Sequence, residues 1–302
     1  MLVQAVESYL AVRRACGFGL KSQGNLLENF AAFSDARRKH RVCSETAVEW
    51  AGLARSVHQR AHRLSQVIRF TRYVRAEDPC HELPPPVFGS QNRPRPIPYI
   101  FSPDNIQRLV QAASQSGYRS LRRQTYSTLF ALLACTGLRV SEAINLRFED
   151  ITPDGLVIRC SKFRKSRLVP LHETAQAGLE RYLQRRRPYA PFDDHVFVSL
   201  RRKRLLLADV EAAFRTSVDK IGLHRTPGLP RPTPHSLRHT FAVRALESCP
   251  DGRDRITKHM LALSTYLGHA KVCNTYWYLE ATPELMRNIA ERCESFLTGG
   301  QS

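Results

Sequence analysis

Apolar residues in the first 78 positions recur at the spacing of helices. Residues three and four apart on a helix share a face, so apolar positions repeated at these intervals indicate amphipathic helices. Three such stripes are formed by Val3, Val6 and Leu10, by Leu26, Leu27, Phe30 and Phe33, and by Leu64, Val67, Ile68 and Val74. The pattern predicts an all-helical module of four or five short helices over residues 1–78.

A proline-rich stretch interrupts this pattern. Seven prolines lie between Pro79 and Pro98, together with Gly89, Ser90 and Asn92. Prolines and small polar residues at this density are typical of connectors between packed elements. We therefore predict a linker over 79–98 and a second domain over 99–302.

The second domain begins with helical signals. Ser102 and Pro103 supply a capping hydroxyl and a proline at the first helical position. A dense apolar segment over 120–135 predicts a core helix that ends at Thr136 and Gly137. A further apolar stripe, carried by Leu285, Ile289 and Phe296, predicts a terminal helix over 283–297.

Two short segments have the character of strands. Residues 156–160 and 167–171 are rich in branched apolar side chains and flank a basic turn, which predicts a β-hairpin. Residues 195–198 are expected to add a short strand. The fold class expected is mostly α with a small β-hairpin or sheet, in two domains.

Charge indicates the kind of partner. The chain has 46 Lys and Arg against 27 Asp and Glu, a formal net charge of +19. Basic residues cluster at 37–41, 164–167, 185–187 and 201–204, and aromatic residues are not tiled along them. This arrangement favours contacts with a phosphate backbone over base stacking, and charge alone does not separate DNA from RNA. A basic surface that only aids solubility is the alternative.

Several function classes lack their expected signals. The eight cysteines are scattered singly, with no spacing that would frame a metal site. His58 and His62 have the spacing of a helical zinc pair, but Gln59 replaces the glutamate base and Arg60 and Arg63 would repel a cation. With no glycine-rich phosphate loop, we expect neither a metal nor ATP nor another cofactor. The apolar runs are too short to cross a membrane, so we expect a cytoplasmic protein.

Four short motifs occur in one order. Thr136-Gly137-Leu138-Arg139 is followed by the hairpin turn with Lys162, by His235-Ser236-Leu237-Arg238-His239, and by Leu267-Gly268-His269 with Tyr278 nine residues later. This set resembles the tyrosine recombinase (phage integrase) family in detail over 97–297. The first helical module resembles the core-binding domain of that family.

The resemblance implies a role for each of six residues. Arg139 and Arg238 would clamp the scissile phosphate, and Tyr278 would be the nucleophile. Lys162 would be the acid for the leaving 5′ hydroxyl, with Lys165 as the competing choice. His235 and His269 would hydrogen-bond the phosphate. His239 and Tyr276 are interpreted as neighbours that pack structurally, and Glu142 as an orienting carboxylate.

These residue types suit the chemistry on physical grounds. Breaking a phosphodiester without metal or water requires a nucleophile that can hold phosphate covalently, and a tyrosine hydroxyl can do so once cations and a base promote loss of its proton. A guanidinium stays charged and can donate to two phosphate oxygens at once. Such a site would give a 3′-phosphotyrosine and a free 5′ hydroxyl.

The resemblance also implies partners and a biological role. We expect double-stranded DNA, a dimer on each site and a homotetrameric synapse, in a nucleoid-associated protein whose accessory factors the sequence does not specify. The run from Trp277 to Pro283 is most like recombinases of transposons and other mobile elements, which favours integration, excision or transposition. A Xer-type dimer-resolving recombinase is the nearest alternative. A type IB topoisomerase-like enzyme and a non-catalytic DNA-binding relative are further alternatives. The terminal helix resembles one that docks on a neighbouring protomer, and docking in cis stays open.

Overall fold

The computed structural model describes residues 2–89, 97–115, 121–159, 166–223, 230–248, 253–268, 275 and 278. The chain divides into two compact units, Met1–Arg95 and Pro96–Ser302. Each unit has a buried apolar core of its own. The roles predicted for the two domains stay predictions.

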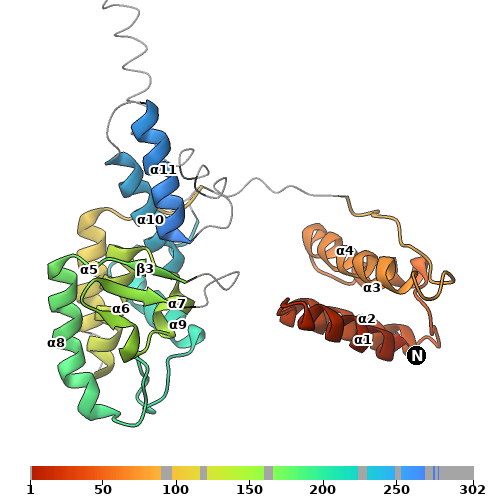
Figure 1. Cartoon of the computed structure of the whole chain (residues 1–302), viewed down its shortest axis with the longest axis horizontal. Helices are drawn as coiled ribbons and strands as arrows, with labels where there is room; N and C mark the ends of the chain where they lie inside the picture. The colour runs from red at the N-terminus through yellow and green to blue at the C-terminus, as the bar shows by residue number, and fades with distance from the viewer. Residues whose placement is uncertain are drawn as a thin grey trace, which may run out of the picture. The chain divides into compact units, whose positions relative to one another are not determined.

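The first unit is helical throughout its regular structure. Its helices are α1 (Leu2–Ala15), α2 (Lys21–Asp35), α3 (Ser44–Gly52) and α4 (Val57–Val74) (Figure 1). The predicted apolar stripes supply much of the core, with Val6, Phe30 and Val67 fully buried, and Trp50 of α3 packs against Phe30. The helical periodicity therefore predicted this unit correctly.

The second unit is also mostly helical. Its helices are α5 (Pro103–Ser114), α6 (Leu121–Thr136), α7 (Val140–Ile144), α8 (Glu173–Tyr189), α9 (Leu207–Lys220), α10 (Pro234–Glu247) and α11 (Arg253–Leu267), with a 3₁₀ turn at Phe148–Asp150. The predicted cap of α5 is confirmed, since the Ser102 hydroxyl accepts from the backbone N–H of Asn105 at 3.1 Å. The fold class expected from the sequence is confirmed.

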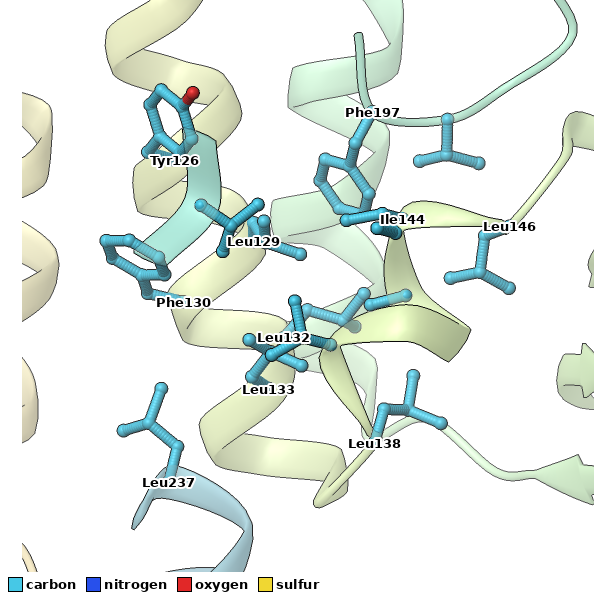
Figure 2. Packing of buried hydrophobic residues seen from close by; sticks show 14 of the residues in the cluster. Tyr126, Leu129, Phe130, Leu132, Leu133, Leu138, Ile144, Leu146, Phe197 and Leu237 are labelled. Atoms are coloured by element: carbon cyan, nitrogen blue, oxygen red, sulfur yellow. The ribbon is translucent and has the colours of Figure 1, made fainter. Parts of the chain in front are cut away.

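Helix α6 lies at the centre of the core of this unit. Its apolar side chains meet residues from α7 and from the loop after α8, and Leu237 approaches from α10 (Figure 2). Leu129, Phe130 and Leu133 are entirely buried. Because α6 is packed on several sides, the residues that follow its last turn are held in fixed positions.

A small antiparallel sheet covers part of this core. Its strands are β1 (Ile151–Thr152), β2 (Gly155–Ile158) and β3 (Arg167–Val169), in the order β1-β2-β3. Strands β2 and β3 form the predicted hairpin, with Leu156 opposite Val169 and Ile158 opposite Arg167. The turn between them, which contains Lys162, lies outside the described residues.

The strand predicted at 195–198 was wrong. His195 and Val198 form only isolated bridges, and the third strand of the sheet is β1. The reason lies in the side chains around this buried segment: the carbonyl of His195 accepts from Arg186 and the carbonyl of Val196 accepts from the Tyr182 hydroxyl. Side chains thus occupy two carbonyls of this segment, while its backbone bonds go to two separate partners, from Val196 N–H to the carbonyl of Leu146 and from Leu205 N–H to the carbonyl of Phe197, so no continuous ladder forms.

No helix in the described parts of the chain combines the length and the apolar character needed to cross a membrane. The terminal helix predicted over 283–297 lies outside the described residues.

Candidate active site

Arg139 is placed by a tight junction after the central helix. Helix α6 ends at Thr136, and Gly137 turns the chain with φ +60°, a left-handed conformation that favours glycine. The ring of Phe241 would lie 2.5 Å from a Cβ at position 137, so the junction also requires the absence of a side chain. Arg139 is then the N-cap of α7, and its backbone N–H donates to the Glu142 carboxylate at 3.0 Å.

Glu142 is the centre of an ionic cluster. One carboxylate oxygen accepts from the guanidinium of Arg139 at 2.7 Å, and both oxygens accept from the guanidinium of Arg167 at 3.1 and 2.8 Å. Burial by itself would raise the pKa of Glu142, but the hydrogen bonds from Arg167 and from the Arg139 backbone hold that pKa at about 2. Glu142 is therefore an ionised carboxylate that orients arginines, as the sequence indicated.

Arg238 approaches the same region from α10. Its side chain is 1% exposed, and the guanidinium donates to the carbonyls of Gly137 and Leu267 at 2.6 Å each. Burial lowers the pKa of Arg238 to about 10, the positive charge of Arg139 acts in the same direction, and Tyr278 opposes it. Arg238 is still charged at neutral pH, and it lies within electrostatic range of both Arg139 and Tyr278.

The two predicted clamp residues meet at the end of α11. Arg238 donates to the carbonyl of Leu267, and Arg139 donates to the carbonyl of Gly268 at 3.2 Å. The carbonyls in the last turn of a helix have no partner within the helix and carry the negative end of its dipole. The structure thus brings together two arginines that are 99 positions apart in the sequence.

His235 belongs to this group. It lies in the first turn of α10, three positions before Arg238. Partial loss of contact with water lowers the pKa of His235, although the residue as a whole is exposed. The positive charges of Arg238 and Arg139 lower the pKa further. At neutral pH the imidazole is therefore neutral and can donate one hydrogen bond and accept another.

Tyr278 packs against α10 and α11. Its side chain is 3% exposed and packs among residues of α10 and α11, which include Val243, Leu246 and Leu263. The hydroxyl lies 3.2 Å from Nδ1 of His239, and the ring of His239 packs edge-on against the ring of His235 at 4.5 Å. A chain of aromatic groups thus runs from Tyr278 to His235.

The structure describes four of the six predicted site residues. They lie where α10 packs beside the end of α11: Arg139, Arg238, His235 and Tyr278. Lys162 and His269 lie outside the described residues, as does Tyr276. The sequence therefore placed four residues in one neighbourhood and leaves two as predictions.

Sequence reasoning missed the contacts of two residues. The sequence places Arg167 only at the start of the second hairpin strand, but the residue is bonded to Glu142, which also bonds Arg139. His239 was interpreted as structural packing, but its imidazole contacts the Tyr278 hydroxyl. Periodicity on α10 could have suggested His239, since it lies one helical turn after His235. Nothing in the local sequence could have paired Arg167 with Glu142, because the contact joins residues 25 positions apart.

Comparisons with known proteins show the family of this chain. Residues 100–284 match the phage integrase family, and the chain belongs to that family. It is 38% identical over 303 residues to y4rB of Sinorhizobium fredii, named an integrase/recombinase, with 96% of each chain covered. It is also 32% identical over 222 residues to the tyrosine recombinase XerC of Pseudomonas syringae pv. tomato. This alignment covers 72% of this chain and 68% of XerC.

A solved structure shares the fold. The Tn1549 transposon integrase in complex with transposon right end DNA aligns with a TM-score of 0.68 over 96% of this chain and 98% of that one, at 17% identity. The chain is thus a tyrosine recombinase, an enzyme of site-specific recombination that breaks and rejoins DNA.

Proposed function

We propose that this recombinase binds duplex DNA and cleaves it with Tyr278, while Arg139 and Arg238 clamp the scissile phosphate. The observation that carries this assignment is the convergence of the two arginines on neighbouring carbonyls at the end of α11, with Tyr278 held beside the same helix α10 through its hydroxyl contact with His239. An incoming phosphate offers anionic oxygens that can replace the neutral carbonyls as acceptors. Charge-assisted hydrogen bonds of this kind are about twice as strong as neutral ones.

The remaining roles follow from the chemistry of the step. The Tyr278 hydroxyl passes its proton to the imidazole of His239 as its oxygen forms a bond to phosphorus. The bond to the 5′ oxygen breaks, and that oxygen takes a proton from Lys162. His235 and His269 donate hydrogen bonds to the non-bridging oxygens. The phosphoester energy is retained in the 3′-phosphotyrosine, so a 5′ hydroxyl from a partner strand can reverse the step without ATP.

The assembly and the biological role are part of the proposal. We infer a dimer on each DNA site and a tetramer when two sites pair. We also infer that the protein is associated with the nucleoid. A role in integration, excision or transposition of a mobile element is supported by the 38% identity with an integrase/recombinase over nearly the whole chain. Similarity to XerC extends over less of the chain and at lower identity.

The test is covalent capture on DNA. The substrates are duplexes with a randomised core and a nick near the centre. Cleavage beside the nick releases a short fragment that carries the 5′ hydroxyl, so the strand cannot be rejoined and the adduct accumulates. We expect the wild-type chain, without ATP and with EDTA present, to yield an adduct that survives denaturation. Tyr276→Phe should also yield it, and Tyr278→Phe should not. An adduct formed by Tyr278→Phe, or none formed by the wild-type chain, would refute the assignment.

A further inference from the structure

Three arginines, not two, cap the end of α11. Arg167 of β3 donates from Nε to the carbonyl of Tyr266 at 2.7 Å. The next two carbonyls, of Leu267 and Gly268, accept from Arg238 and Arg139. Three successive carbonyls at one helix end are therefore satisfied by arginines from three different elements.

Arg167 is joined to the clamp by a second route. Its Nη1 and Nη2 donate to the two oxygens of Glu142, and Glu142 in turn holds both the backbone and the guanidinium of Arg139. The side chains of Arg167 and Glu142 are 10% and 6% exposed. Ionic contacts with so little solvent are weakly screened, so this pair constrains Arg139 more than a surface pair would.

The backbone of Gly268 accommodates the same guanidinium. Gly268 has φ +65°, and a Cβ there would lie 2.9 Å from Nη1 of Arg167. The planar guanidinium therefore lies directly against the residue that precedes His269. Every nitrogen of this guanidinium donates to a protein acceptor, which leaves it poorly placed to bind substrate.

We propose that Arg167 is a positioning residue of the cleavage site, one that fixes Arg139 through Glu142 and fixes the end of α11 through the carbonyl of Tyr266. This inference rests on the proposed function of Arg139 and Tyr278. Arg167 also lies on the return strand of the hairpin that carries Lys162, so one side chain links the strand, the clamp and the segment that leads to His269. A lysine could replace it only in part, because a single ammonium cannot donate to a carboxylate and a carbonyl in one plane.

The alternative is an ion pair that only stabilises the fold. It predicts that loss of Arg167 lowers the free energy of unfolding without changing the cleavage rate of the molecules that remain folded. The positioning role predicts a lower rate at saturating DNA with similar affinity. A displacement of about 1 Å in a reacting geometry can cost on the order of a hundredfold in rate.

The experiment compares Arg167→Gln with Arg159→Gln. Arg159 follows β2 in the same small sheet, pairs with Asp150 and not with Glu142, and is half exposed. The probe is a nicked duplex captured by the wild-type chain in the selection above. We expect Arg167→Gln to slow single-turnover adduct formation roughly tenfold to a hundredfold with its Kd within about threefold of wild type, and Arg159→Gln to retain the wild-type rate. Arg167→Lys should recover only part of the loss.

The pH dependence separates positioning from stability. Without Arg167, burial of Glu142 is no longer offset by its strongest hydrogen bonds, and the pKa of Glu142 rises from about 2. The rate of Arg167→Gln should therefore fall more steeply than that of wild type as the pH is lowered from 7 to 5. Adding Glu142→Gln should remove this extra dependence, because no carboxylate is left to protonate.

Each outcome has a distinct meaning. Arg167→Gln and wild type with equal rates and parallel pH profiles would overturn the positioning role while the Tyr278 assignment stands. If Arg167→Gln fails to fold, Arg167→Lys and the pH profile of Glu142→Gln decide the question, since both keep part of the cluster. Absence of an adduct with the wild-type chain, by contrast, would refute the proposed function itself.

Discussion

At the scale of single residues, the environment of Tyr278 is the most informative feature. Its hydroxyl is buried and lies 3.2 Å from the imidazole of His239, while the ring packs between α10 and α11. A tyrosine hydroxyl has a reference pKa of about 10, so attack on phosphate requires an acceptor for its proton. An imidazole nitrogen at hydrogen-bonding distance is suited to that task.

We therefore expect His239→Phe and His239→Gln both to slow adduct formation, by about a hundredfold, which is a typical contribution of a proton acceptor. Phenylalanine keeps the packing against His235, and glutamine keeps a hydrogen bond but is not basic. Single-turnover rates on the captured duplex are the measurement. A glutamine variant as fast as wild type would mean that His239 only holds the tyrosine in place.

At the scale of elements, the junction between α6 and α7 decides where the clamp lies. Gly137 allows the turn with positive φ, its carbonyl accepts from Arg238, and Arg139 follows two positions later. The ring of Phe241 closes the space where a side chain would be. A change at this one position thus affects helix packing and both arginines together.

Gly137→Ala should destabilise the second unit by about 2 to 4 kcal/mol, from the strain of positive φ together with overpacking against Phe241. Gly222→Ala is the matched control, because Gly222 has φ +71° but nothing within 4 Å of its Cβ position. It should cost only about 1 kcal/mol. Denaturant unfolding of the two variants measures the difference, and equal midpoints would contradict the role of Phe241.

At the scale of the whole molecule, each of the two units has its own hydrophobic core. The first unit buries Trp50, Phe30 and Phe70 among its own helices, and the clamp lies wholly in the second unit. A compact unit with its own core is expected to fold independently. We predict from the sequence that the first unit also binds DNA. Two linked units that both bind DNA would hold it more tightly than either alone, whereas the proposed cleavage chemistry belongs to the second unit.

A chain limited to residues 97–302 should therefore still form the Tyr278 adduct, with affinity for the captured duplex at least roughly tenfold weaker than that of the full chain. Residues 1–89 alone should unfold cooperatively and bind duplex DNA without cleaving it. Thermal unfolding, gel shifts and adduct yield measure these properties. Equal affinities for residues 97–302 and the full chain would show that the first unit does not hold DNA.

The sequence by itself determined the helices of the first unit, the cap of α5, the end of α6 and the β2–β3 hairpin, since each depends on periodicity or on residues close in the chain. It also named Arg139, Arg238, His235 and Tyr278 through ordered motifs. Only the tertiary structure decided that Arg167 meets Glu142, that His239 meets Tyr278 and that residues 195–198 bond to side chains and to two separate backbone segments instead of one strand partner. Those contacts join distant positions through packing, and no local pattern of residues specifies which partners packing brings together.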